Sequence, residues 1–201
     1  EEAKLGFGGR FGAGLPATSD GQMLFLMTAL LFFPVKAEAV GILDTTKEVT
    51  LTISCKDGDR GIANAGFEIY QIGGITEAAE IIPNAAFDGR LPKLRELSGS
   101  EWRDLTQELC QLTQGENLAP VDSGYTDENG MLRFPQDGKK LEQGLYLIVG
   151  GSARQNGYSY TLSSCLVFLP SEDAERKNWN YEVIVCPKFT KTDIPVTPPV
   201  T

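Results

Sequence analysis

The chain has 201 residues, of which 41% are hydrophobic and 22% charged, enough to bury one core of ordinary size. Its 27 acidic and 18 basic residues give a net charge of -9, which disfavours nucleic acid and anionic lipid as partners. Histidine, the commonest general base and metal ligand, is absent, so we expect neither an enzyme nor a metal or cofactor site.

The first 39 residues do not resemble a folded domain. Residues 1–22 are glycine-rich without the G-x-G-x-x-G spacing of a phosphate-binding loop, and we assign them to an extension outside the core. Residues 23–35 are apolar but too few to cross a bilayer as a helix, and the small-x-small triplet AEA follows at 37–39. We therefore predict a secretory signal peptide over residues 23–39 and no other membrane association; a short buried helix is the alternative.

Two strands are predicted next. Residues 49–55, VTLTISC, alternate apolar and polar side chains, which is typical of a strand with one buried face. Residues 56–61 then form a turn, in which Asp57 and Asp59 lack the remaining ligands of a calcium loop and are expected to be solvated. Residues 66–72 form the second strand, but apolar side chains point to both sides and leave its inward face open.

A helical insertion is predicted around residues 95–114. Its apolar side chains recur at helical spacing, Ser98 or Ser100 is placed to cap its start, and Gly115 to end it. The apolar stripe consists of Trp102, Leu105, Leu109 and Leu112. We expect this stripe to pack on a sheet as part of the core.

The rest of the chain consists of short strands separated by turns. Residues 123–134 predict strand, turn and strand, with Asp127, Asn129 and Gly130 shaping the turn, and further strands follow in 144–151, 158–170 and 179–187. Because no helix alternates with these strands, the pattern indicates an all-β, antiparallel β-sandwich. Residues 191–201 contain three prolines and predict an extended linker to further domains.

The last predicted strand has an unusual end. In WNYEVIVCPK, residues 179–188, alternation places four side chains toward the core: Trp179, Tyr181, Val183 and Val185. Pro187 cannot donate a backbone hydrogen bond and should end the strand, which leaves Lys188 accessible at its end.

This stretch has the form W-x-x-x-V-x-V-x-P-K and resembles the pilin motif of Gram-positive sortase-assembled pili. The matching positions are Trp179, Val183, Val185, Pro187 and Lys188. The order of the other segments, from residue 49 to 188, is similar to that of N-terminal domains of major pilins. The chain departs from the family at Cys186 and Phe189, where the motif usually has Tyr and Asn.

The resemblance implies an Ig-like or prealbumin-like sandwich over residues 40–190, belonging to a secreted, cell-wall-attached pilus subunit. It implies that the Lys188 amine accepts an acyl group from a class C sortase, which supplies the catalytic groups. The implied partners are that sortase, other pilin subunits and a host surface ligand. The alternative function is an adhesin or ligand-binding module of the same sandwich class.

Many domains of such pili contain an internal Lys–Asn isopeptide bond assisted by a buried acid. Lys56 with Asn178 or Asn180 is the available combination here. Val149 and Gly150 stand where those domains carry the glutamate, so we predict no internal bond.

The four cysteines include no C-x-x-C pair of the kind used in zinc or redox sites. In a secreted sandwich of this kind, the first and last strands are neighbours, which favours one of three pairings: Cys55–Cys186 with Cys110–Cys165.

Overall fold

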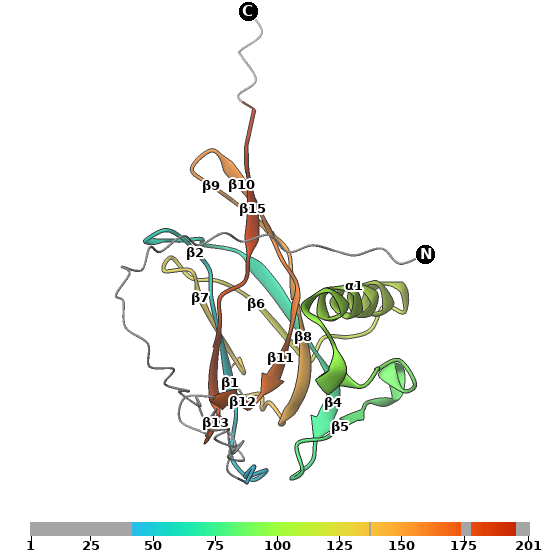
Figure 1. Cartoon of the computed structure of the whole chain (residues 1–201). Coiled ribbons are helices and arrows are strands. Elements are labelled where there is room, and N and C mark those ends of the chain that lie inside the picture. Colours follow the sequence, from blue (N-terminus) through green and yellow to red (C-terminus); the bar gives the residue numbers. More distant parts are fainter. Residues whose placement is uncertain (1–41, 137, 174–177, 196–201) are drawn as a thin grey trace, which may run out of the picture. The chain divides into compact units, whose positions relative to one another are not determined.

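The computed structural model describes residues 42–136, 138–173 and 178–195 (Figure 1). All of them belong to one unit of the chain, Glu38–Thr201. This unit is built mostly of strands with one long helix, which confirms the predicted all-β class with a helical insertion. The predicted extension and signal peptide lie outside the described residues. Within the described ranges, no helix is both long and apolar enough to span a bilayer.

Two sheets face each other across the main core. In the first sheet, β1 is central, with β14 parallel to it on one side and β7 antiparallel on the other. These strands are β1 (Thr50–Ser54), β7 (Met131–Phe134) and β14 (Glu182–Val185). The second sheet has the order β11-β8-β4-β5, and β6 also pairs with β4. Its strands are β4 (Gly66–Ile75), β5 (Ile81–Pro83), β6 (Asp122–Tyr125), β8 (Gly144–Gly150) and β11 (Cys165–Leu169).

A third sheet and two small hairpins complete the strands. The third sheet has the order β15-β10-β9, formed by β9 (Ser152–Gln155), β10 (Tyr158–Leu162) and β15 (Phe189–Asp193). The hairpins are β2 (Lys56–Asp57) with β3 (Arg60–Gly61), and β12 (Ser171–Asp173) with β13 (Asn178–Asn180). Two short 3-10 helices, η1 (Ala85–Phe87) and η2 (Leu94–Glu96), precede the long helix α1 (Gly99–Gly115).

The alternation of β1 builds the core between the two main sheets. Leu51 and Ile53 are fully buried there, opposite Ile69 of β4 and Ile148 of β8, while the intervening threonines are partly exposed. At about 25 cal/mol per Å² of buried apolar surface, such contacts provide the main driving force for folding. The prediction of a one-sided strand at residues 49–55 is confirmed.

The second sheet is buried on both faces. Tyr70 and Ile72 of β4, with Leu145 and Leu147 of β8, point away from the main core and pack in a second cluster under α1. A strand covered on both faces has no polar side, which is why the pattern of residues 66–72 did not define an inward face.

Helix α1 begins with a capping box. The Ser98 hydroxyl accepts a hydrogen bond from Glu101 N (3.4 Å), and Ser98 N donates to Glu101 Oε2 (2.7 Å). Leu105 and Leu109 are buried against the second sheet, and the Trp102 ring meets Phe168 edge-on with 6.1 Å between centroids. The predicted helix, its cap at Ser98 and the packing of its apolar stripe are confirmed.

The turn at residues 127–130 joins the two main sheets. Asp127 Oδ1 accepts hydrogen bonds from Asn129 N (2.9 Å) and Met131 N (2.8 Å), and Gly130 has a φ of 75°, where a side chain would collide with the Cys55 carbonyl. The predicted strand–turn–strand is confirmed. However, β6 before the turn pairs with β4 and β7 after it pairs with β1, so the connection crosses the sandwich.

Three sequence predictions need correction. Residues 158–170 form two strands interrupted at Ser163 and Ser164, and residues 179–187 form β13 and β14 separated by a bend at Tyr181. Residues 191–193, predicted as linker, belong to β15, which pairs with β10. In each case hydrogen bonding to a distant strand determines the boundary, and a local pattern does not contain that information.

Candidate functional site

Lys188 lies at a corner where the chain passes from the first sheet to the third. Strand β14 ends at Val185, before Pro187, and β15 begins at Phe189. Pro187 has no backbone N–H to continue the ladder, which explains why pairing stops there. The Lys188 carbonyl accepts a hydrogen bond from Ser163 N (2.8 Å), so the corner is tied to the β10–β11 connection.

Buried side chains anchor this corner on both sides. Before it, Val183 is 5% exposed and Val185 packs on the main core. After it, Phe189 meets the Tyr160 ring edge-on, with 5.5 Å between centroids. The backbone around Lys188 is therefore held by two strands, while its own side chain is exposed.

Tyr181 strengthens the first anchor. Its hydroxyl accepts a hydrogen bond from Asp44 N (2.9 Å), and the Lys47 ammonium lies over its ring at 4.9 Å from the centroid. Within the described residues, the main core includes Tyr181, Val183 and Val185 but not Trp179, which lies half-buried on β13. The prediction that all four side chains face one core is wrong for Trp179, because the bend at Tyr181 interrupts the alternation.

The two lysines of this segment differ in their surroundings. Among the described residues, no hydrogen bond or ion pair involves the Lys188 ammonium. The Lys191 Nζ lies 2.7 Å from Asp57 Oδ2 and 3.9 Å from the centroid of the Tyr158 ring. The hydrogen bond to Asp57 raises the pKa of Lys191, and the same bond lowers the pKa of Asp57.

Asp57 has a structural role, because its contacts link the β2–β3 hairpin to other strands. Tyr160 Oη donates a second hydrogen bond to Asp57 Oδ2 (3.0 Å), so the carboxylate joins the β2–β3 hairpin to β10 and β15. Among the residues that the structure describes, no group of three or more potential ligands is placed to hold a metal ion.

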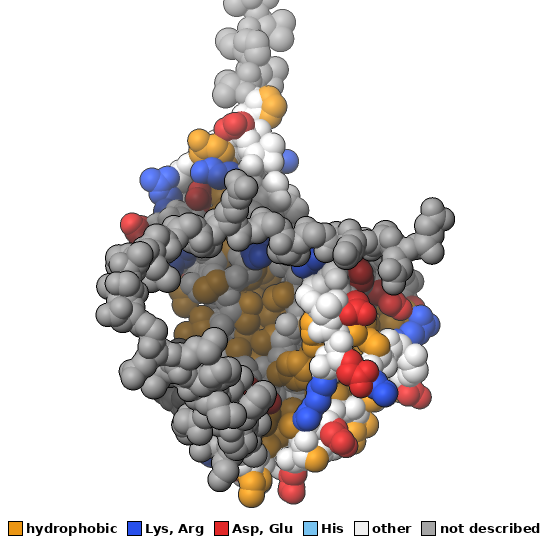
Figure 2. All heavy atoms as spheres, in the orientation of Figure 1, with side chains coloured by type: hydrophobic (Ala, Val, Ile, Leu, Met, Phe, Trp, Pro, Cys, Tyr) orange, Lys and Arg blue, Asp and Glu red, His pale blue; other side chains and the backbone are white. Residues whose placement is uncertain are grey.

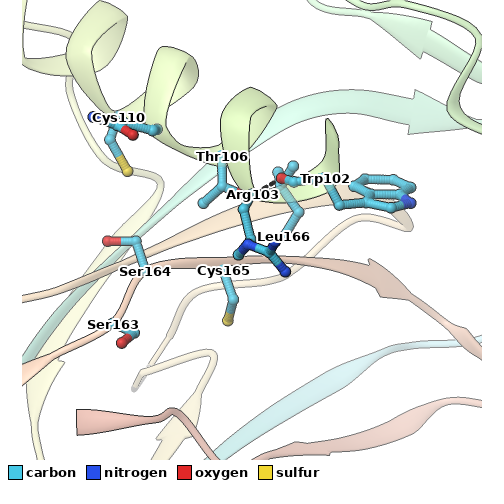
Figure 3. Close-up of a pocket in the computed structure, with 9 residues that line it drawn as sticks. Trp102, Arg103, Thr106, Cys110, Ser163, Ser164, Cys165 and Leu166 are labelled. Atoms are coloured by element: carbon cyan, nitrogen blue, oxygen red, sulfur yellow. Dashed lines mark hydrogen bonds between the residues drawn. The ribbon is translucent and has the colours of Figure 1, made fainter. Parts of the chain in front are cut away.

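An open cavity of about 590 Å³ adjoins the Lys188 corner through Ser163 (Figure 3). One wall is α1 and the other is the start of β11; the lining residues include Trp102, Arg103, Thr106, Ser163, Cys165 and Leu166. Figure 3 shows the Arg103 guanidinium reaching from α1 toward the β11 strand. Figure 2 shows acidic and basic side chains interspersed over the α1 side and hydrophobic side chains gathered in the hollow beside it.

All four cysteines are free thiols, so neither predicted disulfide is present in the structure, and the two pairs differ in their surroundings. Cys110 and Cys165 line the same cavity, and burial raises the pKa of Cys165 to about 11. Cys55 and Cys186 follow the neighbouring strands β1 and β14, but Cys55 is fully buried while Cys186 is exposed. Burial also raises the pKa of the Cys55 thiol to about 11.

The residues considered for an internal isopeptide bond are dispersed. Lys56 pairs with Gly61 in the β2–β3 hairpin, whereas Asn178 and Asn180 pair with β12, at the opposite end of the sheets (Figure 1). Val149 packs under α1 beside Gly150, as hydrophobic and small residues do in a covered strand.

The sequence did not identify Ser163, the cavity or the Asp57–Lys191 contact. The cavity and the contact join segments more than 50 residues apart. The sequence shows a lysine at 191 and a carboxylate at 57, but each is an ordinary surface residue type in its own segment. Nothing in the sequence linked those two segments.

Comparisons with known proteins identify pilin structures at low similarity. No family model matches the chain, and no curated protein matches it. The full-length major pilin SpaD of Corynebacterium diphtheriae matches 74% of this chain with 18% identity and a TM-score of 0.46. The fimbrial protein FimP of Actinomyces oris matches 73% with 19% identity and a TM-score of 0.43, and the basal pilin SpaE of Lactobacillus rhamnosus GG matches 71% with 16% identity and 0.40. The match covers 31% of SpaD, 30% of FimP and 49% of SpaE, so this chain corresponds to less than half of each.

Proposed function

We propose that this chain is part of a subunit of a covalently polymerised cell-surface pilus, and that Lys188 is the acceptor lysine. The observation that carries the proposal is the Lys188 corner. The W-x-x-x-V-x-V-x-P-K stretch ends in an exposed lysine with no side-chain partner among the described residues, on a backbone fixed by strands on both sides. An acceptor needs this combination, because its amine must enter an enzyme cleft on a flexible side chain while its backbone stays in place.

The reaction proposed for Lys188 is acyl transfer. A class C sortase first holds a donor subunit as a thioester between its own cysteine and the threonine carbonyl of the donor's LPxTG signal. The neutral Lys188 amine attacks that carbonyl carbon, the C–S bond breaks, and the sulfur leaves as the sortase thiolate. The amine loses a proton as the amide forms, and the thiolate regains one, so the products are an isopeptide bond and free sortase.

The cavity next to the corner suits the donor's extended segment. It is open, it has apolar side chains such as Trp102 and Leu166, and Ser163 connects it directly to the Lys188 backbone. A donor segment seated there would lie beside the strand connection that holds the Lys188 backbone. We propose that the donor's extended segment binds in this cavity.

The test uses the chain, a class C sortase and a donor with an LPxTG signal, followed by peptide mapping of the cross-linked product. Lys188→Arg keeps the positive charge but removes the nucleophile, and we expect no product. Lys140→Arg, at an exposed lysine between β7 and β8, is the control and should react like the parent. Product formation by Lys188→Arg at the parent's rate would refute the acceptor role.

A ligand-binding module is the second candidate, favoured by another cavity. This cavity, about 450 Å³, lies between β4, β6 and β8 and is lined by Glu68, Gln114 and Tyr125, among others. Tyr125 is 73% exposed, and an exposed aromatic ring next to polar groups suits a sugar or peptide ligand. Titration with a panel of host glycans, followed by NMR shifts at Tyr125 and in a Tyr125→Ala variant, tests this candidate.

A further inference from the structure

Lys188 and Lys191 are two exposed lysines close together in the chain. Lys188 directly precedes β15 and Lys191 lies within it, three residues further along the chain, and both have flexible four-carbon side chains. A sortase that approaches this corner therefore meets two amines within four residues. Something must make one of them the acceptor.

The surroundings of Lys191 differ from those of Lys188 in three respects. Its ammonium donates to Asp57 Oδ2 at 2.7 Å, it lies 3.9 Å from the Tyr158 ring centroid, and it lies 5.8 Å from that of Tyr160. Its side chain retains 36% exposure, and that of Asp57 34%. Each of these contacts favours the charged form or restrains the side chain.

The carboxylate is itself fixed. Asp57 Oδ2 also accepts from Tyr160 Oη at 3.0 Å, and Tyr160 is 4% exposed in the main core. In the β10–β15 ladder Tyr160 lies directly opposite Lys191, so the backbone places these two side chains together beside Asp57. Lys191 therefore contacts a preorganised acceptor, not a mobile surface carboxylate.

We propose that Asp57, Tyr158 and Tyr160 withdraw Lys191 from acylation, so that Lys188 is the single acceptor on this segment. The proposal rests on the acceptor role of Lys188 given above. Chemically, an amine attacks a thioester only through its nitrogen lone pair, and that lone pair is occupied by a proton while Lys191 remains an ammonium bound to Asp57. Asp57, Tyr158 and Tyr160 are specificity-determining residues here, since they act through Lys191 and do not contact the reacting atoms.

The first experiment needs no sortase. The chain is treated with a limiting amount of an acetylating N-hydroxysuccinimide ester, and the rates at individual lysines are measured by peptide mapping. We expect Lys191 to react about fivefold more slowly than Lys188, the upper range for a partly exposed ion pair. Asp57→Asn should remove most of this difference. Equal rates in the parent, or an unchanged Lys191 rate in Asp57→Asn, would overturn the proposal.

Two further variants provide controls. Glu48→Gln removes the same charge from the exposed Lys140–Glu48 pair, 3.5 Å apart with both side chains more than 80% exposed, and should change the Lys140 rate less than about twofold. Tyr158→Leu removes the ring but leaves Asp57 in place, and should raise the Lys191 rate by a smaller factor than Asp57→Asn. A Tyr158→Leu rate equal to the parent's would exclude the ring from the mechanism.

The second experiment adds the sortase and the LPxTG donor. Lys188→Arg should give no product, whereas Lys188→Arg with Asp57→Asn should give a product linked through Lys191. A Lys191 product in Lys188→Arg alone would overturn the inference. The double variant could also give no Lys191 product although its Lys191 reacts fully with the ester. That result would overturn the inference, because the geometry of the sortase complex, and not the Asp57 contact, would then exclude Lys191. If the parent gives no product, the acceptor role fails, while the ester rates still decide whether Asp57 protects Lys191.

Discussion

Asp122 offers a quantitative test of the fold, because its carboxylate is buried and charged at once. The side chain has no exposed surface and accepts hydrogen bonds from Ser123 N (2.9 Å), Gln136 N (2.7 Å) and Lys139 Nζ (2.5 Å). Burial alone would raise the pKa of Asp122, but the hydrogen bonds from Gln136, Lys139 and Ser123 outweigh it and lower that pKa. Asp122→Asn keeps the shape and removes the charge.

The expected cost of Asp122→Asn follows from these contacts. Asn has a single acceptor oxygen, so it can accept from only one of the two backbone N–H groups, which are bound to different oxygens of Asp122. Its NH2 group faces the other backbone donor, and leaving that donor without an acceptor costs about 2 kcal/mol. The Lys139 ammonium adds less than about 1 kcal/mol, because its side chain is 51% exposed and screened by solvent. We expect the free energy of unfolding to fall by about 2 kcal/mol at neutral pH, or about 4–8 °C in Tm.

The pH dependence of the stability difference tests whether the charged form of Asp122 is the stabilising one. A carboxyl whose folded pKa is lowered stabilises the protein fully above its unfolded pKa of about 3.9, and this stabilisation is lost as the pH falls through the folded pKa. Urea unfolding of parent and variant at about pH 7, 5 and 3 should therefore give equal differences at the first two values and a smaller one at the third. Asp88→Asn, at an exposed carboxylate, is the matched control. A variant as stable as the parent at neutral pH, or a difference that grows in acid, would refute the reasoning.

Two other predictions concern α1 and the cavity beside it. Leu109→Ala removes a fully buried side chain that fixes α1 on the second sheet, and should lower the free energy of unfolding by about 3 kcal/mol in urea titrations; a loss below about 1 kcal/mol would contradict the packing described. Because Cys110 and Cys165 line one cavity, they should form a disulfide in a glutathione redox buffer. Each bond formed reduces one glutathione disulfide to two thiols. Non-reducing peptide maps test this, and a bond to Cys55 or four remaining thiols would contradict it.

Local sequence patterns were sufficient to predict an element that has one buried face and one exposed face. Strand β1 alternates between the core and the surface, and α1 has a capping box and a single apolar stripe, so both were predictable from short windows. Strands β4 and β8 are covered on both faces, which removes the alternation that would have oriented them.

The candidate site was predictable only in part, for a similar reason. Pro187 ends β14, and that end was visible in the sequence because proline removes a backbone donor. The continuation as β15, the hydrogen bond from Ser163 and the cavity under α1 all depend on pairing with segments far away in the chain. Trp179 illustrates the same limit: a bend at Tyr181 places it in a hairpin with β12 instead of the main core.

The position of Lys188 directly before β15 has a mechanical consequence. In a polymer joined through Lys188, tension enters the subunit at this side chain and leaves through the residues that follow Asp193. The loaded path inside the domain is then the backbone from Lys188 through β15, whose register with β10 runs from Leu162↔Phe189 to Tyr158↔Asp193. The two main sheets and α1 lie outside this path. They would experience little of the pulling force, so the stability of this domain need not match the strength of the fibre.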